Sequence, residues 1–232
     1  MDVKVLEEKN DTLKLLFKDT NPETMNAIRR HIMNAIPVFA IEDVHIYENT
    51  GVMFDEMLAH RLGLIPLKMD SADYKEGEKV KMILEKEGPC VVYSKDIKST
   101  DPTIEPAFMN IPITKLEEGQ KIKLEMDAIT GTGKQHSKFQ PALVTYQEIP
   151  IVVSEKGGKD KSYKADMIEL LINKGIGSIK LKQGERLEYD NTSFIMTIES
   201  FGNLSPKLLL EKSIEILTQK LGEFRRELKN LS

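Results

Sequence analysis

The chain has 232 residues, of which 40% are hydrophobic and 30% charged, and its formal net charge is −4. An acidic balance argues against a protein that grips nucleic acid over its whole surface, for which strong basicity is expected. No run of about 18 apolar residues is present, so no membrane-spanning helix is predicted. Cys90 is the only cysteine, which excludes an internal disulfide, a cysteine-ligated zinc finger and an iron–sulfur cluster. We therefore expect a globular cytoplasmic protein without a metal or other cofactor.

The first elements predicted along the chain are a hairpin and an amphipathic helix. Residues 3–7 and 12–17 alternate apolar and polar positions around "KND", which predicts two strands joined by a turn. Asn21 and Pro22 then form a typical helix start. The apolar residues of the following helix recur at spacings of three and four, which predicts one apolar face. They are Met25, Ile28, Ile32 and Ile36.

The middle of the chain changes character. A strand is predicted over 40–48 and a short helix over 55–66, where Gly63 and Pro66 end it. From about residue 68, short strand-like runs alternate with Gly, Pro and Asp, as in a small β-rich domain. Another strand is predicted over 191–200.

The last predicted helix begins at Ser205 and Pro206 and carries the most regular pattern in the chain. Large apolar residues follow at alternating spacings of four and three over three heptads. They are Leu210, Ile214, Leu217, Leu221, Phe224, Leu228 and Leu231. Such a face packs either inside the chain's own core or against a partner. Two helices cannot cover each other's apolar faces and a sheet as well, so assembly with a partner is the leading hypothesis.

The segment "GTGK" at Gly131–Lys134 raises the alternative of a nucleotide-binding enzyme. A phosphate-binding loop needs the pattern G-x-x-x-x-G-K-[ST]. Here Ala128 stands at the first glycine position and Gln135 follows the lysine, so the hydroxyl that binds magnesium is missing. Glu56 and His60 have the i, i+4 spacing of two metal ligands, but no third ligand is evident nearby, and such pairs are common on helix surfaces.

The run from Asn26 to Leu67 resembles the signature of the α-like subunits of cellular RNA polymerases and is most similar to the archaeal members. The family pattern combines an Asn-small-apolar-Arg-Arg start with the segment Asp-Glu-x-Leu-Ala-x-Arg-Leu-Gly-Leu-Ile-Pro. The matching residues are Asn26, Ile28, Arg29, Arg30, Ala40, Val44, Asn49, Asp55, Glu56, Leu58, Ala59, Arg61, Leu62, Gly63, Leu64, Ile65 and Pro66. Gly51 departs from the usual Ser, Thr or Ala. The segments "GTGKQHSKFQP" and "FIMTIESFGNLSP" are similar to the family too.

The resemblance implies an α+β fold with a discontinuous dimerisation domain, built from residues 1–48 and 186–232 as a sheet with two long helices. A β-rich domain over 49–185 is inserted between these parts. Many archaeal relatives carry a cysteine-rich, ferredoxin-like module before the final strand. The corresponding residues 151–185 have no cysteine, so this module is either reduced or present without a cluster.

The resemblance also implies a non-catalytic scaffold of DNA-directed RNA polymerase. Its dimer partner would be the small subunit L, small subunits N and P would join the platform, and the large catalytic subunits would dock on it, with DNA reached only through the complex. The dimer interface would comprise Ile28, Ile32, Ile36, Leu210, Ile214, Leu217, Leu221, Phe224 and Leu228. Contacts to the large subunits would involve Arg29, Arg30, Asp55, Glu56 and Arg61. The alternatives are the nucleotide-binding enzyme above and a DNA-binding module, for which a basic recognition helix is lacking.

Overall fold

The computed structural model describes residues 1–70, 74, 77–154 and 185–230. The fold is α+β, as predicted from the sequence. Packing separates the chain into two units, of which the first comprises Met1–Glu8, Leu13–Ala27 and Thr145–Thr197 and the second Lys9–Thr12, Ile28–Val144 and Ile198–Ser232. This division differs from the predicted boundaries at 48/49 and 185/186, which remain predictions. Most of the 151–185 segment lies outside the described residues.

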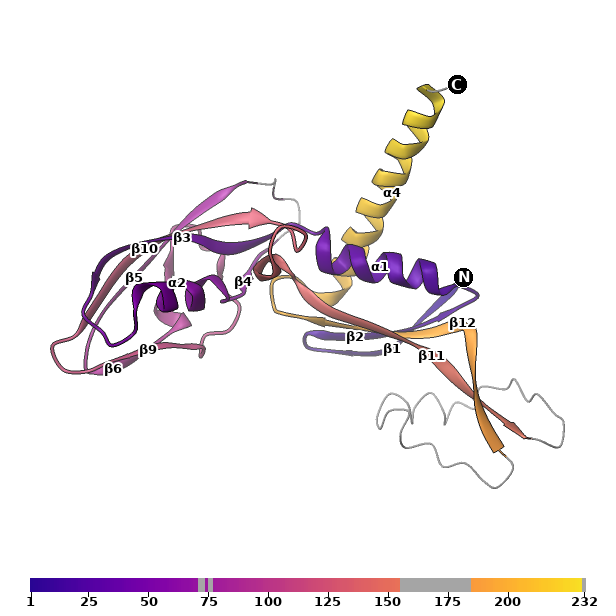
Figure 1. Ribbon diagram of the computed structural model, residues 1–232, viewed down its shortest axis with the longest axis horizontal. Helices are drawn as coiled ribbons and strands as arrows, with labels where there is room; N and C mark the ends of the chain where they lie inside the picture. The colour runs from indigo at the N-terminus through magenta and orange to yellow at the C-terminus, as the bar shows by residue number, and fades with distance from the viewer. Residues whose placement is uncertain (71–73, 75–76, 155–184, 231–232) are drawn as a thin grey trace. The chain divides into compact units, whose positions relative to one another are not determined.

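The first unit is built on a four-stranded sheet with the strand order β1-β2-β12-β11 (Figure 1). The strands are β1 (Asp2–Lys9), β2 (Thr12–Lys18), β11 (Ala142–Ser154) and β12 (Glu185–Ser200). Strands β1 and β2 are the predicted hairpin, and Asn10 takes the positive φ of 46° that its turn requires. Phe194 of β12 is fully buried, and its ring meets that of Tyr146 edge to face at 5.9 Å.

The second unit contains a four-stranded sheet with the order β3-β10-β5-β7. The strands are β3 (Val38–Asn49), β5 (Lys79–Glu87), β7 (Lys98–Ser99) and β10 (Lys121–Gly131). Strand β10 pairs antiparallel with both β3 and β5. Its even-numbered residues from Ile122 to Ala128 are buried, whereas Lys121 and Lys123 on the other face are exposed. This period of two follows from the alternation of side chains along a strand.

Helix α2 (Asp55–Gly63) packs against β3 and β9 (Pro112–Leu116), and Figure 1 shows it beneath the sheet of β3, β10 and β5. Leu58 and Leu62 are its fully buried residues. Two small sheets complete the region, β4 (Leu67–Lys68) with β8 (Glu105–Pro106) and β6 (Cys90–Tyr93) with β9 (Pro112–Leu116). Short 3-10 helices lie at Ser94–Asp96 and Ser137–Phe139.

The two longer helices are α1 (Pro22–Asn34) and α4 (Pro206–Asn230). Their predicted caps are present: the Thr24 amide donates to the Asn21 side chain at 2.9 Å, and the Leu208 amide donates to the Ser205 hydroxyl at 3.3 Å. Among the described helices, none has the length and apolar character needed to cross a membrane.

Candidate partner-binding surface

Helix α4 has two apolar faces, and only one of them is buried. Pro206, Leu209 and Ser213 are buried and anchor the first two turns. The predicted a/d residues lie beside this face, because successive helix residues are turned by about 100°. We call these residues the α4 stripe: Leu210, Ile214, Leu217, Leu221, Phe224 and Leu228. The sequence pattern marks the α4 stripe, but it does not separate it from the buried face that anchors the helix.

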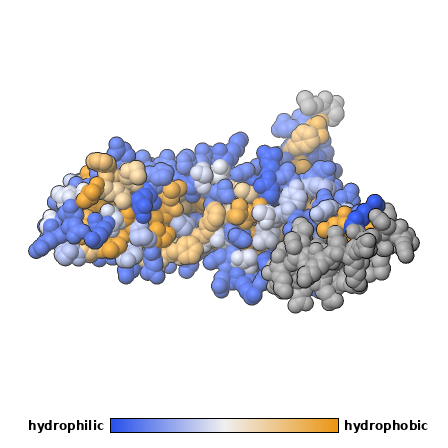
Figure 2. All heavy atoms as spheres, turned by 60° about the horizontal axis from the view of Figure 1, so that its bottom comes forward, coloured by the Kyte–Doolittle hydropathy of each residue, from blue (hydrophilic) through white to orange (hydrophobic). Residues whose placement is uncertain are grey.

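The α4 stripe is largely open to solvent. Ile214, Leu221, Phe224 and Leu228 are 47%, 59%, 62% and 50% exposed, while Leu210 and Leu217 are half-buried. From Thr218 to Asn230 every residue of α4 is exposed. Figure 1 shows these last turns clear of the other elements of the second unit. Figure 2 shows hydrophobic residues, in orange, along this part of the helix. A contiguous apolar stripe left in water in this way is typical of a protein–protein interface.

A groove of about 900 Å³ lies between the first turns of α4 and the end of α1. Ala35, Ile36 and Pro37 form one wall. The other wall includes Glu211, Lys212, Ile214, Glu215, Ile216, Thr218 and Gln219. Ile214 therefore belongs both to the α4 stripe and to the groove, so the two form one continuous surface.

The apolar residues of α1 are placed differently from the prediction. Ile28, Ile32 and Ile36 were expected to share the partner surface, but only 5%, 0% and 0% of their surfaces are exposed. They pack inside the chain, where they form part of its core. The surface that remains open is therefore supplied by α4, with α1 contributing only through the residues that follow its last turn.

The "GTGK" segment holds the end of α1. The Lys134 amide donates to the Asn34 carbonyl at 3.2 Å, so it satisfies a carbonyl at the C-terminal end of the helix. Gly133 is needed for this approach, since a Cβ there would lie 2.2 Å from the Met33 carbonyl oxygen. A phosphate-binding loop instead precedes a helix and points its amides at an anion at the helix N-terminus. The geometry of Gly131–Lys134 is thus that of a helix cap.

Helix α2 carries a second exposed apolar face that the sequence reasoning missed. Phe54, Met57 and Leu64 are 76%, 57% and 52% exposed. Together with Arg61 they follow spacings of three, four and three, so all four lie on one side of the helix. We call them the α2 face. Arg61 donates to the Pro112 carbonyl at 2.6 Å, and a pocket of about 210 Å³ lies beside it. The same spacing rule that found the α4 stripe would have found this face.

The other family-motif residues include one that shapes the turn before α2. The Asn49 side chain donates to the Met53 carbonyl at 2.9 Å and to the Asp55 carboxylate at 2.7 Å. It also accepts from the Gly51 amide at 3.1 Å, and a Cβ at Gly51 would lie 3.2 Å from that oxygen. Gly51, which departs from the family pattern, therefore avoids a tight contact between a Cβ and the Asn49 side-chain oxygen.

The charged motif residues differ in exposure. Asp55, Glu56, Arg30 and Arg61 are exposed, whereas Arg29 is half-buried and donates to the Met33 sulfur at 3.3 Å. Within the described residues, no group of three or more His, Cys, Asp or Glu is arranged to hold a metal ion. Glu56 and His60 accordingly gain no third ligand there.

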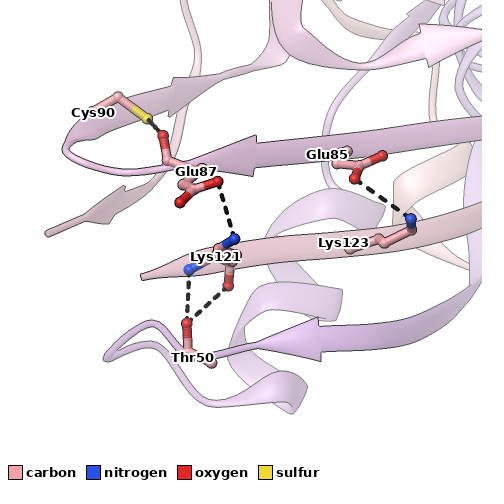
Figure 3. A network of polar contacts seen from close by, with 6 residues as sticks. All are labelled: Thr50, Glu85, Glu87, Cys90, Lys121 and Lys123. Carbon is pink, nitrogen blue, oxygen red and sulfur yellow. Dashed lines mark hydrogen bonds and ion pairs between the residues drawn. The ribbon is translucent and has the colours of Figure 1, made fainter. Parts of the chain in front are cut away.

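The outer face of the β3-β10-β5 sheet carries cross-strand ion pairs, which we call the charged ladder. Lys121 pairs with Glu87 at 3.1 Å and Lys123 with Glu85 at 3.4 Å (Figure 3), and Lys81 pairs with Glu125 at 2.7 Å. The hydrogen bond from Lys81, supported by one from Tyr47, lowers the pKa of Glu125. The hydrogen bond to Glu87 raises the pKa of Lys121. Because its charges are already paired, this face is suited to solvent.

Comparison with known proteins first defines the class. Residues 44–151 match the family described as the RNA polymerase Rpb3/RpoA insert domain. The match begins near the predicted start of the inserted domain and covers most of the second unit's strands.

Similarity over the full chain identifies the family within that class. The chain is 33% identical to the DNA-directed RNA polymerase subunit Rpo3 of Pyrococcus furiosus, over 100% of this chain and 98% of that protein. It is 40% identical to the Rpo3 subunit of Methanocaldococcus jannaschii, over 88% and 83% of the two chains. With the Rpo3 subunit of Thermococcus kodakarensis it shares 33% identity, over 100% and 99%. The chain belongs to the archaeal Rpo3 family of RNA polymerase subunits.

Proposed function

We propose that the α4 stripe and the adjoining groove bind the small subunit L. As an Rpo3-family member, the chain is a non-catalytic assembly subunit of DNA-directed RNA polymerase. The observation that supports the partner surface is the exposure of four large apolar side chains on one face of α4. Large apolar and aromatic anchors surrounded by polar residues are the usual energetic centre of protein interfaces. Phe224 and Leu221 are the most exposed anchors and therefore gain most from burial.

The α2 face is proposed as a second docking surface, for the large catalytic subunits. It combines three exposed apolar side chains with Arg61, a residue type that interfaces favour because it makes planar, multiple hydrogen bonds. Asp55 and Glu56 at the start of the same helix add acidic groups at its rim. The charged ladder on the sheet is unsuited to this role, because burying its pairs would remove their hydration. Subunits N and P would complete the platform.

The proposed role requires no cofactor and places the protein in the cytoplasm with the rest of the polymerase. Elemental analysis of the purified chain should give less than one zinc or iron per molecule. One bound metal per chain would contradict the proposal and would bring Glu56 and His60 back as ligands.

A nucleotide-binding enzyme remains less well supported, because the Gly131–Lys134 segment serves as a helix cap. We expect no micromolar binding of ATP to the purified chain. ATP binding that Lys134→Ala abolishes would favour the enzyme instead.

The partner proposal is tested by co-expressing the full chain with a tagged subunit L. Leu221→Asp places a charge in the middle of the α4 stripe and should abolish co-purification, because an unpaired carboxylate buried in an interface is strongly unfavourable. Arg226→Asp, on the opposite side of the same helix, is the control and should co-purify normally. Both side chains are exposed in the free chain, so folding should be unaffected. Normal recovery of the Leu221→Asp complex would refute the proposal.

A further inference from the structure

The apolar residues of the α4 stripe do not by themselves define a direction. Their positions are symmetric about Gln219: Leu217 and Leu221 lie two residues away from it on either side. Leu210 and Leu228 lie nine residues away, and Ile214 and Phe224 lie five away. A partner helix laid along the stripe would therefore bury similar apolar groups in either orientation. Apolar burial is non-directional, so another feature must select one orientation.

The charges on one flank of the α4 stripe change sign along the helix. Glu211 and Glu215 lie on this flank in the early turns, Thr218 lies in the middle, and Arg225 and Lys229 lie on it near the end. All five are exposed. The flank is thus acidic beside the groove, neutral at the centre of symmetry and basic at the far end of the helix.

The charged side chains at the two ends of this flank are exposed. Glu215 is paired with Lys212 at 2.8 Å, but its side chain is still 68% exposed. Among the residues that the structure describes, no ion pair involves Glu211 or Arg225. Glu211 also lines the groove, which joins the acidic end of the flank to the proposed interface.

We propose that this change of sign sets the direction in which the partner lies on α4. The partner subunit presents acidic side chains to Arg225 and Lys229 and basic side chains to Glu211 and Glu215. The reversed orientation would bring like charges together at both ends of the flank. Charged residues beside an apolar seam select partner and orientation in this way in paired helices. The inference rests on the proposed function, since it concerns the same surface.

The test measures association of the full chain with subunit L at low and high salt. Arg225→Glu combined with Lys229→Glu should slow association about tenfold at low salt, because charges at an interface rim act mainly on encounter. The difference should shrink at high salt, where charges are screened. Arg226→Glu is the control, because it reverses one charge on the side of the helix that faces away from the α4 stripe, and it should associate like the wild type.

Each outcome separates the inference from the proposed function. Wild-type association rates for the Arg225→Glu/Lys229→Glu variant, or an equal slowing by Arg226→Glu, would overturn the inference while Leu221→Asp still abolished binding. If none of these variants, including Leu221→Asp, changed the binding of subunit L, the proposed function itself would be overturned. Light scattering should give the mass of a one-to-one heterodimer. A complex of two copies of this chain would show that the flank serves self-association and would overturn the assignment of the partner.

Discussion

The two amphipathic helices have similar sequence patterns but very different surroundings. In α1, apolar residues at spacings of three and four are buried, and Met25 and Ile32 have no exposed surface. In α4, a longer pattern of the same kind leaves Phe224 62% exposed. The α1 residues find their neighbours within the chain, whereas α4 extends past the elements that hold its first turns. Periodicity therefore identifies an apolar face, but the surrounding elements decide whether the chain itself covers it.

The comparison predicts opposite consequences for the same substitution in the two helices. Ile32→Asp places an unpaired carboxylate in the core and should destabilise the isolated chain by more than about 3 kcal/mol. Chemical denaturation measures this loss directly. Ile32→Val is the conservative control and should cost about 1 kcal/mol. A fully stable Ile32→Asp variant would mean that α1 is not part of the core.

Phe224→Asp should instead spare the isolated chain and damage the complex. Its free energy of unfolding should change by less than about 0.5 kcal/mol, because the ring is already in water. Binding of subunit L should weaken by about 2 kcal/mol or more, or roughly 30-fold, because a buried aromatic anchor is lost. Titration calorimetry and denaturation of the same sample measure both effects. A stability loss comparable to that of Ile32→Asp would erase the distinction between the helices.

Two glycines, Gly133 in the loop beside the end of α1 and Gly222 within α4, sharpen the comparison. Gly133→Ala should destabilise the chain by about 1–3 kcal/mol, because its Cβ would lie 2.2 Å from the Met33 carbonyl oxygen at the end of α1. Gly222→Ala in α4 meets nothing within 4 Å and should stabilise the helix by about 1 kcal/mol. Thermal unfolding of the two variants should shift in opposite directions. Equal shifts would show that the loop does not hold α1.

The smallest expected effect concerns the charged ladder. The pKa of Glu125 is lowered in the folded chain, mainly by the hydrogen bond from Lys81. The ionised Glu125 carboxylate therefore stabilises the folded chain above the ordinary glutamate pKa of about 4.3. This stabilisation is lost as the pH falls through the lowered pKa. Glu125→Gln should slightly lower the melting temperature at neutral pH and leave it nearly unchanged near pH 2. The exposed Glu118→Gln serves as the control, and a pH-independent loss in Glu125→Gln would rule out the linkage.

Local signals predicted the elements well, whereas packing could not be predicted from them. Asn21, Ser205 and the alternation over residues 3–7 and 12–17 each act through neighbours close in sequence, so the caps and the first hairpin could be predicted correctly. The burial of Ile28, Ile32 and Ile36 depends on elements distant in the chain, which periodicity does not encode. The α2 face has a weaker signal than the α4 stripe, because it has only three apolar residues and Arg61 stands between them. The helix-capping role of Gly133 depends on a contact one hundred residues away and has no local signature.

The charged ladder also bears on how the protein responds to heat. Hydration of ions becomes less favourable as temperature rises, so removing charges from water to form pairs costs less in hot solution. Several cross-strand pairs on one sheet face, such as Lys121–Glu87 and Lys81–Glu125, therefore contribute more to the folded state near the boiling point of water than at 25 °C. Hydrophobic stabilisation per unit area levels off over the same interval. The second unit thus contains two stabilising layers with different temperature dependence, an apolar inner face and an ionic outer face on the same strands.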